Sequence, residues 1–151
     1  MARKSTIYIV SSWFNSSIES MVILHRQLYD NDQLDQIDME VYVTDLSAII
    51  FHSYGIDDVE THFDINIHQM PADRAVFFGL VLNEIISNAC KYAFKEHSSP
   101  ILVINLNENA NETTLFVKDN GTKAVKIASS TSFGMKLINM MATQLNGEVT
   151  T

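Results

Sequence analysis

Cysteine, proline and glycine are all scarce in this sequence, and each shortage excludes a class of protein. Among 151 residues there are one cysteine, two prolines and five glycines. The single cysteine, Cys90, has no partner thiol, which excludes disulfides and a cysteine-rich zinc site and favours a reducing cytoplasm. The low proline and glycine content excludes fibrous and low-complexity chains. At this length and with 46% apolar residues, the chain is expected to bury one core.

The apolar start of the chain is too short to cross a membrane. The run at 7–10 is followed directly by Ser11 and Ser12, whereas a membrane helix needs about 20 apolar residues. A signal peptide is therefore not expected, and the chain should make no direct membrane contact.

Positive charge is also in short supply. The sequence has 10 basic against 18 acidic residues, a formal net charge of −8, and its basic residues are scattered. Such a surface repels phosphate backbones, so nucleic-acid binding is not expected. A nucleotide bound with Mg²⁺ stays compatible with this charge, because the metal ion supplies positive charge that the protein lacks.

Helical spacing of apolar residues predicts four helices, and local signals mark some of their ends. Gly55 is expected to stop the second helix, and Gly147 to end the fourth helix. A turn is expected at 70–73, with Pro71 near the first turn of the third helix. Two of these helices are expected before any strand. The predicted ranges are 18–29, 37–55, 71–94 and 132–147.

Alternation of apolar and polar residues predicts a half-buried strand at 59–67. Two more strand runs, 101–107 and 113–118, flank the polar stretch ENANE and should form a hairpin-like unit. The segment 119–131 has no periodicity and is expected to be a loop. This mixture of helices and strands without regular alternation predicts an α+β two-layer sandwich, with a mixed sheet covered on one face by helices.

A polar stripe lies on the long third helix. Glu84, Asn88, Lys91 and Lys95 are spaced i, i+4, i+7 and i+11, which keeps them within a narrow arc of an α-helix. An amphipathic surface helix explains this stripe without any ligand. A carboxylate, a carboxamide and an ammonium in one line could also ligate a hard cation and reach a phosphate.

Two short fragments downstream are ambiguous when each is taken alone. The first, DNG at 119–121, follows a strand and is also ordinary hairpin-turn chemistry. The second, SFG at 132–134, could bind an anion at a helix N-terminus, or could be a helix start capped by Ser132.

The order of these motifs is more specific than any one of them. From about 18 to 149, the chain resembles the ATP-binding domain of sensor histidine kinases. The shared order is NEIISNACKYAF, two strands, DNG, a polar loop, SFGMKLI and ATQLNGEV. That superfamily, which has the Bergerat-type ATP-binding fold, includes DNA gyrase and MutL. The upstream piece SMVILHRQLYDNDQLDQIDMEVYVTDL resembles the segment that joins dimerisation helices to this domain.

The resemblance implies roles for four residues of the long helix. Asn88 would ligate Mg²⁺ and Lys91 would face the phosphates of ATP. Tyr92 would lie beside the nucleotide, and Glu84 matches the position that polarises a water molecule in related ATPases.

The resemblance also implies roles for residues downstream. Asp119 would accept a hydrogen bond from the adenine amine, Gly121 would let the base approach the backbone, and Gly134 would belong to a lid over the phosphates. A buried carboxylate at Asp119 would oppose the O6 carbonyl of guanine, at a cost of about 1–3 kcal/mol, which favours ATP over GTP by roughly tenfold or more. Lys123 stands where the family usually has a second glycine.

These likenesses imply a division of the chain. Residues 1–36 are expected to be an N-terminal helical segment at the end of a dimerisation region, and 37–151 an ATP-binding domain that lacks the family's further strand at its C-terminus. His25 lies in the connecting segment and is expected to be a structural or surface residue, so the phosphoacceptor histidine should lie elsewhere.

The implied function is the cytoplasmic, ATP-binding catalytic domain of a bacterial two-component sensor histidine kinase. It would transfer the γ-phosphoryl of Mg-ATP to a histidine absent from this chain, with a histidine-bearing dimerisation domain and a response regulator as partners, and would be a homodimer in the intact protein. Two alternatives stay open. One is a degenerate nucleotide-binding or dimerisation scaffold, and the other is a serine kinase of the anti-sigma type.

Overall fold

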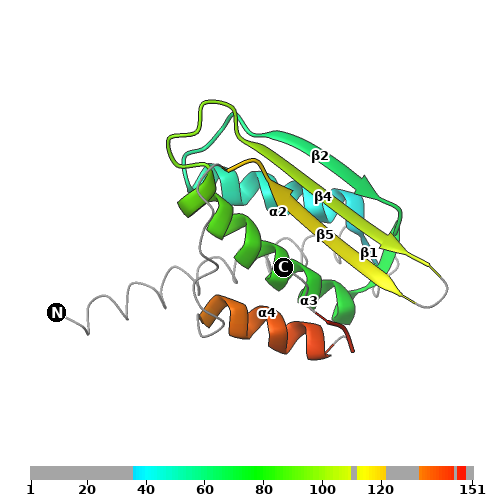
Figure 1. The fold of residues 1–151 in the computed structure, drawn as a ribbon. Helices are drawn as coiled ribbons and strands as arrows, with labels where there is room; N and C mark the ends of the chain where they lie inside the picture. The colour runs from blue at the N-terminus through cyan, green and yellow to red at the C-terminus, as the bar shows by residue number, and fades with distance from the viewer. Residues whose placement is uncertain (1–35, 110–111, 122–132, 145, 149–151) are drawn as a thin grey trace.

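The computed structural model describes residues 36–109, 112–121, 133–144 and 146–148, which form helices packed on a mixed sheet (Figure 1). The predicted helix at 18–29 lies outside the described residues, as do His25, Lys123 and Ser132.

The second predicted helix is preceded by a short strand. Strand β1 comprises Gln36–Asp38 and helix α2 comprises Met39–Ser53. The helix begins where the side chain of Asp38 caps it, with Oδ1 accepting a hydrogen bond from the backbone N–H of Val41 at 3.1 Å. The expectation that two helices precede any strand is therefore wrong at 36–38. Gly55 ends the helical turn with φ of +67°, as predicted.

The partner of β1 lies where a turn was predicted. Strand β2 comprises Glu60–Ile65, within the predicted range, and is followed by β3, Gln69–Pro71. Strand β3 pairs antiparallel with β1 and places Ile37 opposite Met70. Both side chains are buried, so the prediction of a turn at 70–73 is wrong at its first two residues because Met70 contributes to the core.

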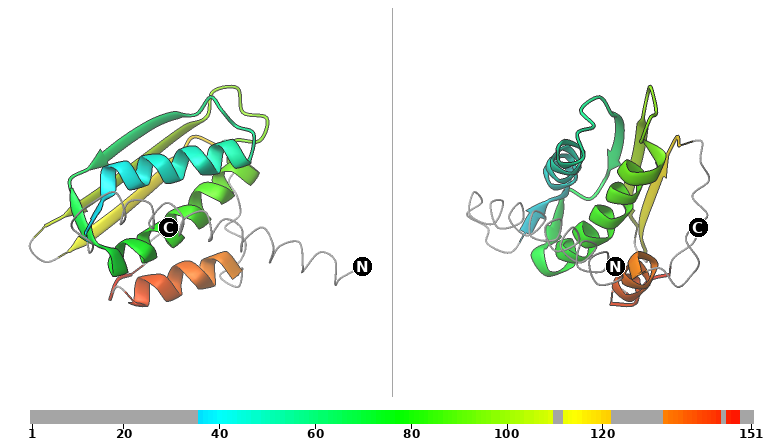
Figure 2. Two further views of the ribbon diagram at one scale, coloured as in Figure 1. Left: turned by 180° about the vertical axis from the view of Figure 1, so that it is seen from behind. Right: turned by 90° about the vertical axis from the view of Figure 1, so that its left-hand side faces the viewer.

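The main sheet has three strands in the order β2-β4-β5. Strand β4, Ile101–Glu108, runs parallel to β2 and antiparallel to β5, Thr113–Asp119. This confirms both the mixed sheet and the hairpin-like unit. Helices α2 and α3 cover one face of the sheet (Figure 2). The central strand β4 is buried at every second residue, namely Leu102, Ile104 and Leu106.

The long predicted helix changes type near its end. Helix α3 comprises Ala72–Asn88 and continues as a π-helix, η1, over Ala89–Ala93. The backbone N–H of Phe94 donates to the carbonyl of Ala89 at 2.8 Å, an i to i+5 bond that replaces the α-helical i to i+4 bond. The prediction of one regular helix through Phe94 is therefore wrong in its last turn.

Helix α4, Phe133–Gln144, lies beyond α3 at the far side from α2 (Figure 2). Ile138 is its buried residue among those described. The chain leaves the helix through Asn146, whose φ is +54°, with Gly147 N–H donating to the carbonyl of Ala142 at 2.8 Å. The predicted stop at Gly147 is one residue late, because Asn146 takes the left-handed conformation. No helix within the described ranges has the length and apolarity needed to cross a membrane.

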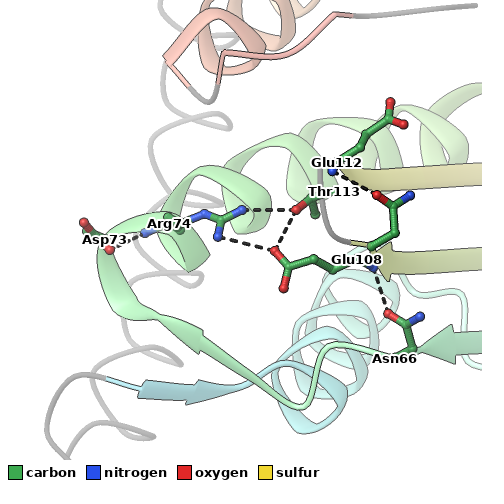
Figure 3. Close-up of polar contacts among 7 residues, drawn as sticks. Asn66, Asp73, Arg74, Glu108, Glu112 and Thr113 are labelled. Carbon is green, nitrogen blue, oxygen red and sulfur yellow. Dashed lines mark hydrogen bonds and ion pairs between the residues drawn. The ribbon is translucent and has the colours of Figure 1, made fainter.

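Hydrogen bonds and an ion pair connect the start of α3 to the β4–β5 hairpin (Figure 3). Arg74 donates from Nη2 to Thr113 Oγ1 at 3.2 Å, and its Nη1 lies 3.6 Å from Glu108 Oε1. Thr113 in turn donates to the same Glu108 oxygen at 2.9 Å. Asn66 extends the network to the chain beyond β2, since its Oδ1 accepts from the backbone N–H of Glu108 at 2.9 Å. These bonds fix the helix end that is opposite to η1.

Candidate functional site

Three segments meet around the π-helix. The ring centroids of Phe51 and Phe94 lie 6.4 Å apart, which joins the end of α2 to the end of η1. The Nζ atom of Lys91 lies 5.8 Å from the ring centroid of Tyr54. Ala93 contacts Gly121, which follows β5. Single π-helical turns within longer helices are frequent at functional sites, so this end of the molecule is the candidate site.

Glu84 and Asn88 form a polar pair on the last α-helical turn of α3. Asn88 Nδ2 donates to Glu84 Oε1 at 3.1 Å, and the contact is partly buried. The bond uses the amide nitrogen and therefore leaves the amide oxygen Oδ1 for other partners. Mg²⁺ prefers oxygen ligands of this type. This donor set fits one protein ligand to Mg²⁺, with the remaining positions filled by phosphate and water.

The DNG segment forms a compact structure at the end of β5. Asp119 Oδ1 accepts from the backbone N–H of Gly121 at 2.8 Å. Asn120 is bound to the start of β4, with Oδ1 accepting from Ile101 N–H at 2.8 Å and Nδ2 donating to the carbonyl of Ser99 at 2.9 Å. Within the described part of the chain, the segment does not lead into a strand paired with β5. The hairpin-turn alternative stays open, because the residues that follow Gly121 lie outside the described ranges.

Gly121 lies directly against the π-helix. A Cβ atom added at this position would lie 2.5 Å from Ala93 Cβ, 2.8 Å from Ala93 Cα and 2.9 Å from Asp119 Oδ1. The first two distances are far below van der Waals contact, and Cα belongs to a backbone that cannot move alone. Glycine is thus required by the close approach of η1, which couples the position of Asp119 to that of Ala93.

The Asp119 carboxylate is exposed. The predicted preference for adenine over guanine requires a buried carboxylate and stays a prediction. Because water can still solvate the carboxylate, any discrimination depends on a bound base covering it.

Only two residues of the predicted four-residue stripe line the pocket beside the π-helix. Lys91 and Lys95 line a pocket of about 560 Å³ whose walls also include Tyr54, and neither Glu84 nor Asn88 is among the lining residues. The α-helical spacing assumed for the stripe ends at Asn88, before Lys91 and Lys95. The pocket is lined by Tyr54, Gly55, Ile56, Cys90, Lys91, Phe94, Lys95, Glu96 and His97.

Two more predicted site residues lie near this region. Tyr92 is 51% exposed on η1 and so presents its ring to solvent. Gly134 is in the first turn of α4, the helix that packs against α3.

Cys90 is on the same π-helix but is not a reactive group. Its side chain is buried, and burial raises the pKa of the thiol to about 12, while the neighbouring Lys91 charge acts in the opposite direction. A thiol with this pKa stays protonated at neutral pH and is a poor nucleophile. Within the described ranges, no three residues of the types His, Cys, Asp and Glu are grouped to hold a metal ion.

Comparison with known proteins points to one group. The histidine kinase family model HisKA_2 matches residues 3–54, about a third of the chain. The histidine kinase domain of the Erythrobacter litoralis EL346 blue-light activated histidine kinase matches 97% of the chain with a TM-score of 0.74 and 18% identity. The chain is similar in fold to a histidine kinase domain. The matched part is 76% of that domain structure.

A second structure extends this comparison. The longer Erythrobacter litoralis EL346 blue-light activated histidine kinase matches 90% of the chain with a TM-score of 0.75 and 17% identity, and the chain spans 49% of it. No curated protein matches the sequence. The family-model match crosses the predicted boundary at residue 36 and ends at Tyr54, so the division at that point stays a prediction.

Three residues of the site were not predicted from the sequence. Tyr54 and Ala93 gave no local signal, because each contacts a residue that is distant along the chain or brought near by the π-helix. Asn120 could have been recognised, since asparagine beside a strand end commonly bonds to nearby backbone groups.

Proposed function

We propose that this chain is the ATP-binding catalytic domain of a two-component sensor histidine kinase. The observation that carries the proposal is that the Glu84–Asn88 pair directly precedes the π-helix and the Asp119–Gly121 turn lies against it, at the end of a helix that covers a mixed sheet. A histidine-kinase-like fold and the family-model match support the choice of this class over other nucleotide-binding proteins.

The adenine would bind beside Asp119. With Oδ1 bonded to Gly121 N–H, the second oxygen of this exposed carboxylate could accept from the adenine amine. The same oxygen would oppose a carbonyl on guanine, so burial by the base would produce the preference for ATP. Gly121 contributes by letting the turn lie close to η1.

The phosphates would bind near the last α-helical turn of α3. Asn88 offers an amide oxygen to Mg²⁺, while Glu84 holds the amide nitrogen and can orient a water molecule. Lys91 would face the phosphates, Tyr92 would lie beside the nucleotide, and Gly134 would belong to the lid that covers them. Mg²⁺, when bound with the nucleotide, would supply further positive charge against the phosphates, in addition to that of Lys91.

Phosphoryl transfer by such a site depends on positioning and charge neutralisation. The acceptor would be a histidine on a separate dimerisation region, followed by a response regulator, in a homodimeric intact protein. A cytoplasmic location is part of the proposal, because ATP and a reduced, buried Cys90 both suit that compartment.

The test is calorimetric titration with a non-hydrolysable Mg-ATP analogue. The wild-type chain should bind it in a metal-dependent way, and Asn88→Ala should weaken binding by about tenfold, equivalent to about 1.4 kcal/mol. Asn107→Ala, an equivalent change at the hairpin end of β4, is the matched control and should bind like wild type. Equal, metal-independent binding by wild type and Asn88→Ala would refute the proposal.

Two further measurements separate the alternatives. A dimer in light scattering that binds no nucleotide would favour the scaffold. If the chain phosphorylates a partner, acid treatment distinguishes the acceptor, because phosphohistidine is acid-labile and phosphoserine is not. An acid-stable product would favour a serine kinase.

A further inference from the structure

The lysine expected to face the phosphates is in contact with an aromatic ring. Lys91 Nζ lies 5.8 Å from the centroid of Tyr54, within the roughly 6 Å range of cation–π attraction. The two side chains form part of one open pocket of about 560 Å³. Within the described residues this ring is the partner that the structure gives the Lys91 ammonium.

The Tyr54 side chain packs, partly buried, against the hydrophobic core, and the backbone of this residue is fixed at the helix end. Its N–H donates to the carbonyls of Ile50 and Phe51 at 3.2 and 3.1 Å, and the next residue, Gly55, closes the helix end in the left-handed conformation. The Phe51–Phe94 ring contact further joins this helix end to η1. Lys91, by contrast, carries its charge on a flexible four-carbon stem. Any separation of the two groups would therefore be a movement of Lys91.

We propose that Tyr54 competes with nucleotide phosphates for Lys91 and so lowers the affinity of the site for phosphorylated ligands. The inference rests on the proposed function, because it assumes that Lys91 contacts phosphate in the bound state. Tyr54 is then a positioning residue that acts through Lys91 and touches neither the base nor the phosphates.

The size of the effect follows from the populations of the two positions. A ring contact of this exposed kind favours the held position by roughly two- to fivefold. Lys91 is then released from the ring in roughly one third to one sixth of the molecules. Because nucleotide binds the released form, the apparent Kd exceeds the intrinsic Kd by the inverse of this fraction, roughly three- to sixfold. A full phosphate charge attracts an ammonium more strongly than a ring does, so the ligand still binds.

The experiment compares four variants of the full chain in calorimetric titrations. Tyr54→Leu removes the ring but keeps apolar volume, and should tighten binding of the Mg-ATP analogue by roughly three- to sixfold. Tyr54→Phe keeps the ring and should remain within about twofold of wild type. Adenosine, which lacks phosphate, should bind Tyr54→Leu and wild type equally. Adding Tyr54→Leu to Lys91→Met should change nothing, because the cation is already absent.

The outcomes separate this inference from the proposed function. Nucleotide binding with the same Kd in wild type and Tyr54→Leu overturns the competition alone. The same tightening for adenosine, or in the Lys91→Met background, also overturns it, since Tyr54 would then act without Lys91. Absence of Mg-nucleotide binding in both wild type and Tyr54→Leu overturns the proposed function and the competition together. A thermal melt of each variant checks that it is folded.

Discussion

Replacing Gly121 by alanine is expected to damage both stability and the site, for one geometric reason. The new methyl carbon would lie 2.5 Å from Ala93 Cβ and 2.8 Å from Ala93 Cα, so the turn and η1 must separate. Overpacking of this kind typically costs about 1–3 kcal/mol. For a chain of this length, such a loss lowers the melting temperature by roughly 2–12 °C.

The same displacement should weaken nucleotide binding. Gly121 N–H donates to Asp119 Oδ1 at 2.8 Å, and the added Cβ would also lie 2.9 Å from that oxygen. Hydrogen bonds to a charged group contribute about 1.5–3 kcal/mol, so disturbing this one is expected to raise the Kd of the Mg-ATP analogue by about tenfold or more.

Circular dichroism melts and calorimetric titration measure the two effects. Gly147→Ala is the matched control, because a Cβ there would meet only the Ala142 carbonyl oxygen at 3.5 Å, an ordinary contact. Its stability should stay within about 0.5 kcal/mol of wild type. The compensating change Ala93→Gly removes the closest methyl and should recover part of the stability that Gly121→Ala loses. An unchanged melting temperature and an unchanged Kd for Gly121→Ala would refute the coupling between the turn and the π-helix.

Two predictions concern the core. Gly79→Ala should destabilise the fold by roughly 1–3 kcal/mol in urea titration, because the new Cβ would collide with the Tyr42 hydroxyl and lie 2.7 Å from Tyr42 Cζ. Combined with Gly79→Ala, Tyr42→Phe should recover part of that loss. Tyr42→Phe alone should not destabilise the fold, since the buried hydroxyl has no hydrogen-bond partner among the described residues. A decrease of more than about 1 kcal/mol in the free energy of unfolding of Tyr42→Phe would contradict this. For Cys90, folding raises the thiol pKa from 9.0 to about 12, so the unfolded chain loses its proton first and stability should fall as pH rises from about 9 towards 12. Over pH 9 to 10.5, Cys90→Ala should lose less stability than wild type, by roughly 1–2 kcal/mol, and equal slopes would contradict the assignment.

The longer elements could be predicted from the sequence because their periodicity is local. Helix α2, the body of α3 and strands β2, β4 and β5 all lie within or close to their predicted ranges. Strands β1 and β3 were missed for a physical reason. Each has three residues, and their pairing joins Ile37 to Met70, so no local pattern marks either one.

The roles assigned to the site residues stay predictions, but one contact of the site could be predicted from the sequence. The Glu84–Asn88 hydrogen bond follows from the i, i+4 spacing of an α-helix. The π-helix has no signature in ACKYA, which would fit an α-helix equally well. The π-helix contains or adjoins residues with long-range contacts, namely Ala93 with Gly121, Phe94 with Phe51 and Lys91 with Tyr54, and no local pattern predicts these contacts.

The two different neighbours of β4 have a consequence for the order in which the chain assembles. Its antiparallel partner β5 begins five positions after β4 ends, so this hairpin can close in roughly 1–10 μs. Its parallel partner β2 pairs across about forty residues that include the whole of α3, and such distant pairing is slow. On a ribosome, β2 is synthesised before both of the other strands. We therefore expect the strand that is made first to be the last to join the sheet.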